Sequence, residues 1–189
     1  MSKTKILLLG PCESGKSYIA NFLSEAFEAT SGNYRPTHGV RILEFEVTGV
    51  TVNGRMTRSD IELWDVSGDR RYEACWPAVA KDSSAIVFVY NPDVRTHERE
   101  LDSWHTHFAQ DLRDTQCIVF AHQKPSAPAS KPDIYLSGAF SKIPTVITNL
   151  EEDPDAVRIE FTNFLSRLLS AMSEKREQEE INIMNSRDL

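Results

Sequence analysis

One octapeptide, Gly-Pro-Cys-Glu-Ser-Gly-Lys-Ser at residues 10–17, constrains the fold more than any other part of the chain. It fits the phosphate-binding pattern G-x-x-x-x-G-K-S/T without a mismatch, and an apolar run over residues 5–9 precedes it directly. Such a loop lies between a buried strand and a helix, so that backbone N–H groups and the helix dipole converge on a phosphate. The sequence therefore predicts a strand, a phosphate loop and a helix over residues 17–29.

The loop residues have distinct expected roles. Gly10 and Gly15 allow the tight backbone turn, Lys16 brings a charge to the outer phosphates, and the Ser17 hydroxyl is expected on Mg²⁺. We expect phosphate contacts from seven residues of this region: Gly10, Glu13, Ser14, Gly15, Lys16, Ser17 and Tyr18.

Two later motifs extend the predicted phosphate site. Tyr34-Arg35-Pro36-Thr37 forms a polar connector, and a threonine there can complete the Mg²⁺ shell when a third phosphate is bound. The chain then alternates as an edge strand over 41–47, turns at Asn53-Gly54 and returns over 60–64. Asp65 and Gly68 form D-x-x-G at the end of that strand, which favours water-mediated contact of Asp65 with Mg²⁺ and a Gly68 N–H on the terminal phosphate.

Composition limits the functional class and the number of domains. The 189 residues carry a net charge of -7 with a pI of about 5.3, so general nucleic-acid binding is not expected. The three cysteines lack metal-ligand spacing, and we expect no membrane span and no lipid anchor, hence a cytoplasmic protein. We predict one domain over residues 1–173 and a charged, solvated tail over 174–189.

Further apolar runs complete an α/β pattern. Residues 85–90, 117–121 and 145–147 read as buried parallel strands, and a long C-terminal helix is expected after Pro154. Leu101, Trp104, Phe108 and Leu112 line one helical face between the first two of these strands. His97, His105 and His107 lie around the same helix, and their spacing favours exposed side chains over metal ligands.

In its motifs the chain resembles Ras/Rab-type small GTPases over residues 3–172. More narrowly, residues 10–17, 39–46, 75–78 and 149–154 are similar to the Rab-like subunit of the intraflagellar transport B complex. The resemblance implies a P-loop small GTPase fold with a six-stranded, mostly parallel sheet flanked by helices. It also implies bound GTP or GDP with Mg²⁺, a coiled-coil heterodimer of that complex as partner, location at the cilium or flagellum and its base, and a monomer on its own.

The positions that support hydrolysis depart from the family pattern. Asp69 stands where active relatives carry a water-orienting Gln, so we expect its carboxylate to gain a raised pKa near the terminal phosphate or to turn away. Cys12 replaces a Gly and crowds the same region. Slow hydrolysis is therefore predicted. Arg70 and Arg71 could supply a compensating cation, although a solvated turn or pairing with Asp69 is favoured.

The predicted base site departs further. After the strand at 117–121 the chain reads His-Gln-Lys-Pro-Ser, where relatives carry N-K-x-D to read guanine, so the choice between guanine and adenine is left open. His122 and Lys124 are candidates to cover the base, and Asn149 falls near the place of another family loop. Residues 124–142 contain three prolines and no helical period, which predicts that one family helix is shortened or replaced by a loop.

Three functions are compatible with these features. The first is a nucleotide switch in which GTP orders Thr37 and the 66–80 segment for docking, with exposed Tyr72 and Trp76 as anchors. The second is a structural pseudo-GTPase that binds the same partner without nucleotide. The third is a P-loop phosphotransferase, which would need an arginine-rich lid that residues 122–142 do not offer.

Overall fold

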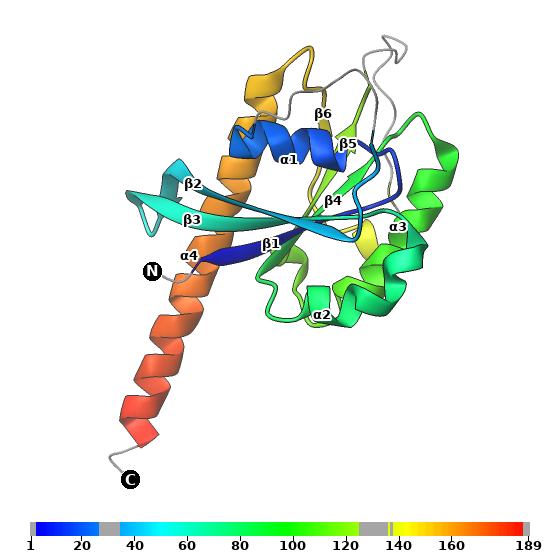
Figure 1. The fold of residues 1–189 in the computed structure, drawn as a ribbon. Coiled ribbons are helices and arrows are strands. Elements are labelled where there is room, and N and C mark those ends of the chain that lie inside the picture. Colours follow the sequence, from blue (N-terminus) through cyan, green and yellow to red (C-terminus); the bar gives the residue numbers. More distant parts are fainter. Residues whose placement is uncertain (1–2, 27–34, 125–135, 137, 187–189) are drawn as a thin grey trace.

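The computed structural model describes residues 3–26, 35–124, 136 and 138–186 (Figure 1). In chain order the described elements are β1 (Thr4–Leu9), α1 (Lys16–Ser24), β2 (Val40–Val52), β3 (Arg55–Val66), η1 (Arg70–Cys75), α2 (Trp76–Ala80), β4 (Ala85–Tyr90), α3 (Arg95–Phe108), η2 (Asp114–Gln116), β5 (Cys117–His122), η3 (Gly138–Phe140), β6 (Thr145–Thr148) and α4 (Pro154–Ser186). The three η elements are short 3₁₀ helices.

The six strands form one sheet in the order β2-β3-β1-β4-β5-β6. Only the β2–β3 pair is antiparallel, and β1, β3, β4, β5 and β6 are joined by parallel ladders. Because parallel strands need crossover connections, the helices cover both faces of the sheet. The predicted six-stranded, mostly parallel fold is confirmed.

Two apolar cores lie on opposite faces of this sheet. Alternation along β1 sends Ile6 and Leu8 to the core under α1 and α4, and Leu7 and Leu9 to the core under α2 and α3. Figure 1 shows α1 and α4 on one side of the sheet and α2 and α3 on the other. The carboxyl end of β1 therefore emerges between two packed layers, where the phosphate loop begins.

The β2–β3 hairpin forms the edge of the sheet, as the alternating pattern predicted. Asn53 and Gly54 turn it with φ values of 48° and 77°, which suit an Asn-Gly turn. The strand register shifts between Val47 and Val50, so two residues of β2 oppose one of β3 at a bulge. Both strands extend further toward the turn than the predicted 41–47 and 60–64.

The first helix is shorter than the predicted 17–29. It ends at Ser24, because Glu25 adopts a left-handed conformation with φ 54°. The Glu25 and Ala26 N–H groups then donate to the carbonyls of Phe22 and Asn21 at 3.3 and 3.1 Å, which closes the last turn. The remainder of the predicted helix, from residue 27, lies outside the described residues.

The region around 124–142 is described only in part, since residues 125–135 and 137 lie outside the described residues. Its described part contains η3, which packs Phe140 into the core beside α3. A shortened element at this place is consistent with the prediction, whose loop portion falls mostly on residues that are not described.

The C-terminal helix α4 begins at Pro154 as expected and continues without interruption past residue 173 to Ser186. Residues 174–184 within it are exposed, which is compatible with the expected solvated segment. Figure 1 shows this helix passing along the sheet and projecting beyond it. Among the described residues no helix combines the length and apolar character required to cross a membrane.

Candidate functional site: a phosphate loop and its neighbours

The phosphate loop connects β1 to α1, and its two glycines are required by what lies against them. Gly10 has φ 146°, and a Cβ atom there would overlap the carbonyl oxygen of Val89 in β4. Gly15 has φ 98°, and a Cβ atom there would overlap the His122 ring at the end of β5. Both conformations strain any residue with a side chain, so these positions accept glycine alone without distortion.

Lys16 is the first residue of α1, and its side chain folds back across the loop. Its Nζ donates to the carbonyl oxygens of Gly10 at 2.8 Å and Pro11 at 2.6 Å. Only 5% of the residue is exposed. Burial lowers the pKa of Lys16 to about 8, an effect that the Asp65 carboxylate partly opposes. The Lys16 ammonium in the loop is therefore easier to deprotonate than that of an exposed lysine.

The three predicted metal ligands converge from three different elements. The Ser17 and Thr37 hydroxyl oxygens lie 2.8 Å apart, and the Thr37 hydroxyl donates to Asp65 Oδ2 at 3.4 Å. Asp65 is fully buried, and its Oδ1 has no hydrogen-bond partner among the described residues. Burial raises the pKa of Asp65, while the Ser17 hydroxyl and the Arg41 guanidinium lower it. Hydroxyl and carboxylate oxygens with one unsatisfied buried oxygen fit the ligand preference of Mg²⁺.

Arg41 is a further member of this cluster, which the sequence motifs did not indicate. Its Nη2 donates to Asp65 Oδ2 at 3.3 Å and to the Ser17 backbone carbonyl at 3.5 Å. The antiparallel register places Arg41 directly opposite Asp65. This strand register could have predicted the contact between Arg41 and Asp65, but only if the bulge between Val47 and Val50 had been known. Arg41 therefore supplies the positive charge beside the buried carboxylate.

The D-x-x-G turn lies directly against the phosphate loop. A Cβ atom on Gly68 would overlap the backbone of Pro11 and Cys12, which explains the glycine at this position. Asp69 turns toward Arg71, accepting from its backbone N–H at 2.9 Å and from its Nε at 2.7 Å. These bonds lower the pKa of Asp69, and the carboxylate is engaged by Arg71 in the chain without nucleotide. The expected response of Asp69 to a terminal phosphate stays a prediction. Arg70 instead donates to the Ser103 hydroxyl at 2.8 Å.

The two predicted partner anchors differ in exposure. Tyr72 is half-buried, and its hydroxyl lies 3.2 Å from His38 Nδ1. The prediction of an exposed Trp76 is wrong, because only 3% of the residue is exposed and its ring centroid lies 4.5 Å from that of Trp104. Val79 is buried beside it in the same core. Within the 66–80 segment that GTP was expected to order, α2 is therefore packed through Trp76 and Val79, whereas η1 contains no buried residue.

The candidate base residues occupy three distinct environments. His122 is 4% exposed, its Nδ1 lies 3.2 Å from the Thr148 hydroxyl, and burial followed by the Lys124 charge lowers its pKa to about 4. Its neutral ring packs against Gly15, a position that braces the phosphate loop. Lys124 is half-buried. Asn149 Oδ1 accepts from the backbone N–H groups of Glu151 and Glu152, so this side chain shapes the loop after β6.

Four other predicted positions complete the comparison. Glu13 and Tyr18 are exposed at the loop, Ser14 is fully buried within it, and Tyr34 lies outside the described residues. His97, which was expected to be exposed, is 7% exposed, and its Nδ1 accepts from the Asn91 N–H at 3.2 Å. The part of the chain that the structure describes contains no cluster of three or more His, Cys, Asp or Glu side chains arranged to hold a metal.

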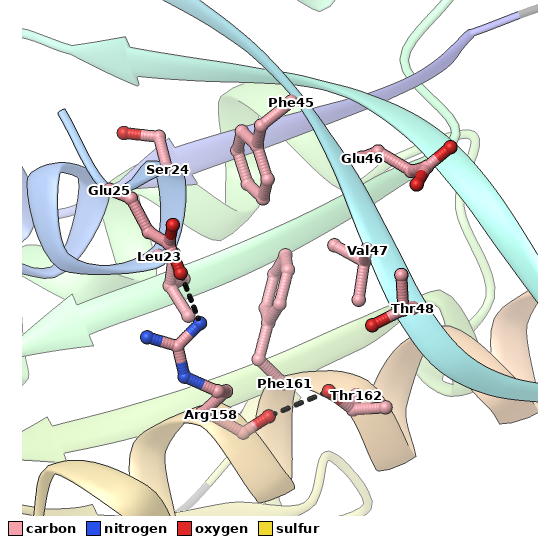
Figure 2. Close-up of a pocket in the computed structure, with 10 residues that line it drawn as sticks. All are labelled: Leu23, Ser24, Glu25, Phe45, Glu46, Val47, Thr48, Arg158, Phe161 and Thr162. Atoms are coloured by element: carbon pink, nitrogen blue, oxygen red, sulfur yellow. Dashed lines mark hydrogen bonds and ion pairs between the residues drawn. The ribbon is translucent and has the colours of Figure 1, made fainter.

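A separate hollow opens at the other end of α1, away from the phosphate loop (Figure 2). Phe45 from β2 and Phe161 from α4 face one another across it, and Arg158 pairs with Glu25 at 3.3 Å at its side. None of the predicted site residues lines this hollow. It is therefore no part of the phosphate site.

Comparison with known proteins agrees with this geometry. Residues 5–124 match the family described as the Ras of Complex, Roc, domain of DAPkinase. The chain is 46% identical over 186 residues to the intraflagellar transport protein 22 homolog of Homo sapiens, covering 97% of this chain and all of the relative. This chain belongs to the intraflagellar transport protein 22 family. The family extends to Trypanosoma brucei brucei, whose protein is 38% identical over 137 residues, covering 62% of this chain and 63% of the relative.

Solved structures of T. brucei IFT22 share the fold of this family member. The GDP-bound structure superposes with a TM-score of 0.70 at 27% identity, covering 91% of this chain and 99% of that one. The GTP-bound structure gives a TM-score of 0.68, with 27% identity and coverage of 88% and 95%. A chain of the GTP-bound T. brucei IFT22/74/81 structure gives a TM-score of 0.63, with 28% identity and coverage of 86% and 95%. The P-loop small GTPase fold is thereby established for this IFT22-family chain.

Proposed function

We propose that this chain is an atypical Rab-like GTP-binding subunit of the intraflagellar transport B particle. In this proposal it binds GTP with Mg²⁺, hydrolyses it slowly and docks on a coiled-coil heterodimer needed for cilium or flagellum assembly. The convergence of the Ser17 and Thr37 hydroxyls on buried Asp65 is the observation that carries the proposal. GTP-bound and GDP-bound forms of the T. brucei relative support the same nucleotide.

The phosphates would take over the position that the Lys16 ammonium now fills. Lys16 Nζ binds two loop carbonyls, and an arriving polyphosphate offers it stronger, charge-assisted partners. The loop N–H groups and the N-terminus of α1 add further donors. Ser17 and Thr37 would contact Mg²⁺ directly, and Asp65 would hold it through water, as in other P-loop GTPases. Bound Mg²⁺ would neutralise charge on the outer phosphates.

Slow hydrolysis follows from the residues beside the terminal phosphate position. Asp69 lacks the amide donor that orients a water molecule, and its carboxylate is engaged by Arg71. Arg71 is thereby occupied, and Arg70 is directed toward α3 through Ser103. Neither arginine is placed as a free cation beside the loop, which favours a clamp that holds GTP over an efficient enzyme.

Docking would depend on the Thr37 connector and on the adjoining surface around Tyr72. Thr37 contacts the proposed metal site, and its neighbour His38 contacts the Tyr72 hydroxyl. A change in Thr37 position is thus relayed to one half-buried aromatic side chain. The T. brucei IFT22/74/81 assembly suggests that the corresponding two subunits provide the partner surface here. Cytoplasmic and ciliary location follow from this assignment.

The test compares partner binding by Lys16→Ala and Ser17→Ala with binding by Ser24→Ala, a control change on the same helix. Nucleotide released from each denatured protein is identified and counted by mass analysis. We expect guanine nucleotide in the wild type and the control, its loss from the two loop variants, and partner binding weakened at least about tenfold by that loss. A wild-type preparation that is folded and binds no nucleoside triphosphate with Mg²⁺ would refute the proposal.

The second candidate is a pseudo-GTPase that binds the same partner whether or not nucleotide is present. The observation that favours it is the packing of Trp76 and Val79, which keeps one side of the site ordered without ligand. Undiminished partner binding by folded, nucleotide-free Lys16→Ala would establish it. The phosphotransferase alternative has lost its support, because the chain belongs to the intraflagellar transport protein 22 family.

A further inference from the structure

The tip of the β2–β3 hairpin is fastened to α4 by a series of hydrogen bonds. The Thr51 N–H donates to the Ser166 hydroxyl at 3.0 Å, and the Asn53 N–H donates to the Ser170 hydroxyl at 3.4 Å. The Asn53 side-chain amide reaches one turn further, to the Ser173 hydroxyl at 3.3 Å and to Glu177 at 3.5 Å. The projecting part of α4 is therefore held against the hairpin.

This arrangement leaves a groove between β3 and α4, which we call the hairpin groove. Its lining includes Thr4, Val52, Thr57, Asp60, Leu169 and Met172, together with the three arginines considered next. Val52, Leu169 and Met172 are half-buried apolar side chains that pack against the core below. The groove thus has an apolar floor between two fixed walls, one a strand and the other a helix.

Arg55, Arg58 and Arg176 surround this floor and are all exposed. Arg58 pairs with Glu46 at 3.5 Å, whereas Arg55 and Arg176 form no ion pair with any described residue. Asp60 is the one carboxylate among the residues that line the groove. A local positive charge on a chain with net charge -7 is a departure from the surface as a whole, and it selects an anionic occupant.

The spacing of residues on α4 indicates that the occupant is a helix. Leu169, Met172, Arg176, Glu179 and Ile183 follow a heptad spacing, so they share one face of α4 and continue that face beyond the sheet. Glu179 on this face pairs with Lys175 at 3.7 Å, which offsets its negative charge. A partner helix lying along this face would insert apolar side chains over Leu169 and Met172. Its carboxylates would reach Arg55 and Arg176, because acidic residues flank the apolar seam of such a helix.

We propose that the hairpin groove is a docking site for an acidic amphipathic helix of a partner protein. The groove lies at the amino end of β1, beside Thr4, whereas the phosphate loop follows the carboxyl end of the same strand. Partner contact there does not touch bound nucleotide, so it is a second surface that acts independently of the proposed switch. A nucleic acid or anionic membrane is disfavoured because the net charge of -7 repels an extended anionic surface.

The test uses a synthetic helical peptide with leucine at the heptad seam and glutamate elsewhere, together with a scrambled peptide and a peptide with lysine in place of glutamate. Binding to the full chain is measured by fluorescence anisotropy, and the contact is mapped by amide chemical shifts. We expect shifts at residues 55–60 and 169–176 and equal affinity with GTP and GDP. Arg55→Glu combined with Arg176→Glu should weaken binding at least about tenfold, and Arg95→Glu on α3 should leave it unchanged.

A second variant, Thr57→Trp, fills the groove without changing its charge and should also weaken peptide binding at least about tenfold. It provides the test if the double variant does not fold. Equal binding of the lysine peptide, or shifts outside the groove, would overturn the proposal. Self-association that the double variant abolishes would assign the groove to a second copy of this chain. Tighter binding to phosphatidylserine vesicles or single-stranded DNA than to the peptide would assign it to a general polyanion site. Either result would also overturn the proposal.

Discussion

The buried lysine of the phosphate loop predicts that nucleotide affinity falls as pH rises. Burial lowers the pKa of Lys16 to about 8 in the unliganded chain, whereas bound phosphates would hold the lysine charged. Binding above pH 8 must therefore take up a proton. Below that pH the charge of Lys16 is already present, so this lysine adds little further pH dependence. Between about pH 7 and about pH 9, a pKa near 8 weakens affinity about tenfold, since each pH unit beyond the pKa costs one factor of ten.

Isothermal titration calorimetry with a slowly hydrolysed GTP analogue would measure this dependence directly. Repeating the titration at about pH 9 in two buffers of different ionisation enthalpy should reveal uptake of nearly one proton per bound nucleotide. Lys16→Arg provides the matched control, because its guanidinium stays charged throughout and its weaker binding should not vary with pH. Wild-type affinity that changes less than about twofold across this range would refute the placement of Lys16 as a buried, shifted lysine.

Three other measurements follow from the same geometry. Trp76→Ala should lower the free energy of unfolding by about 3–5 kcal/mol in chemical denaturation, whereas Tyr72→Ala should cost much less, and equal effects would contradict the buried Trp76. Asp69→Gln with Cys12→Gly should raise the single-turnover rate of GTP hydrolysis at least about tenfold, and an unchanged rate would separate slow hydrolysis from these residues. Because burial lowers the pKa of His122 to about 4, protonation favours the unfolded chain as pH falls below 6.5, and His122→Asn should remove up to about 3 kcal/mol of that acid destabilisation.

The parallel strands and the phosphate loop could be predicted because their signals are local. Buried parallel strands read as continuous apolar runs, and β4 was predicted with the bounds that it has in the structure. β5 and β6 each extend one residue beyond their predicted ends. The octapeptide at 10–17 contains both the glycines that its backbone turn needs and the lysine that supplies the positive charge. These features depend on neighbours in sequence, so one sequence is enough to find them.

The pairing of Arg41 with Asp65 depends on a β-bulge in β2 that could not be predicted from the sequence. Counting from the Asn53-Gly54 turn with unbroken register would place Val66 opposite Arg41. The bulge between Val47 and Val50 inserts one residue into β2, and this shift brings Asp65 opposite Arg41 instead. One extra residue thus decides which side chain faces the buried carboxylate. The structure brings the three predicted ligands Ser17, Thr37 and Asp65 together, and it adds Arg41, which the motifs did not indicate.

The burial of Trp76 and His97 also could not be predicted from the local sequence pattern. Trp76 begins a helix of only five residues, too short for a periodicity that distinguishes its buried side from its exposed side. His97 is buried because it accepts from the Asn91 backbone after β4, a contact fixed by the packing of α3. In both cases the tertiary contact, and not the residue type, sets the exposure.

The seating of Trp76 against Trp104 has a consequence for how such a molecule could signal. Because this indole packs α2 against α3, the position of α2 is fixed in the chain without nucleotide. What a bound triphosphate can still rearrange is the connector that carries Thr37. In such a protein only the connector with Thr37 would change position on nucleotide binding. A partner that distinguishes the GTP-bound form would therefore have to contact this connector, whereas contacts with α2 would be the same in both forms.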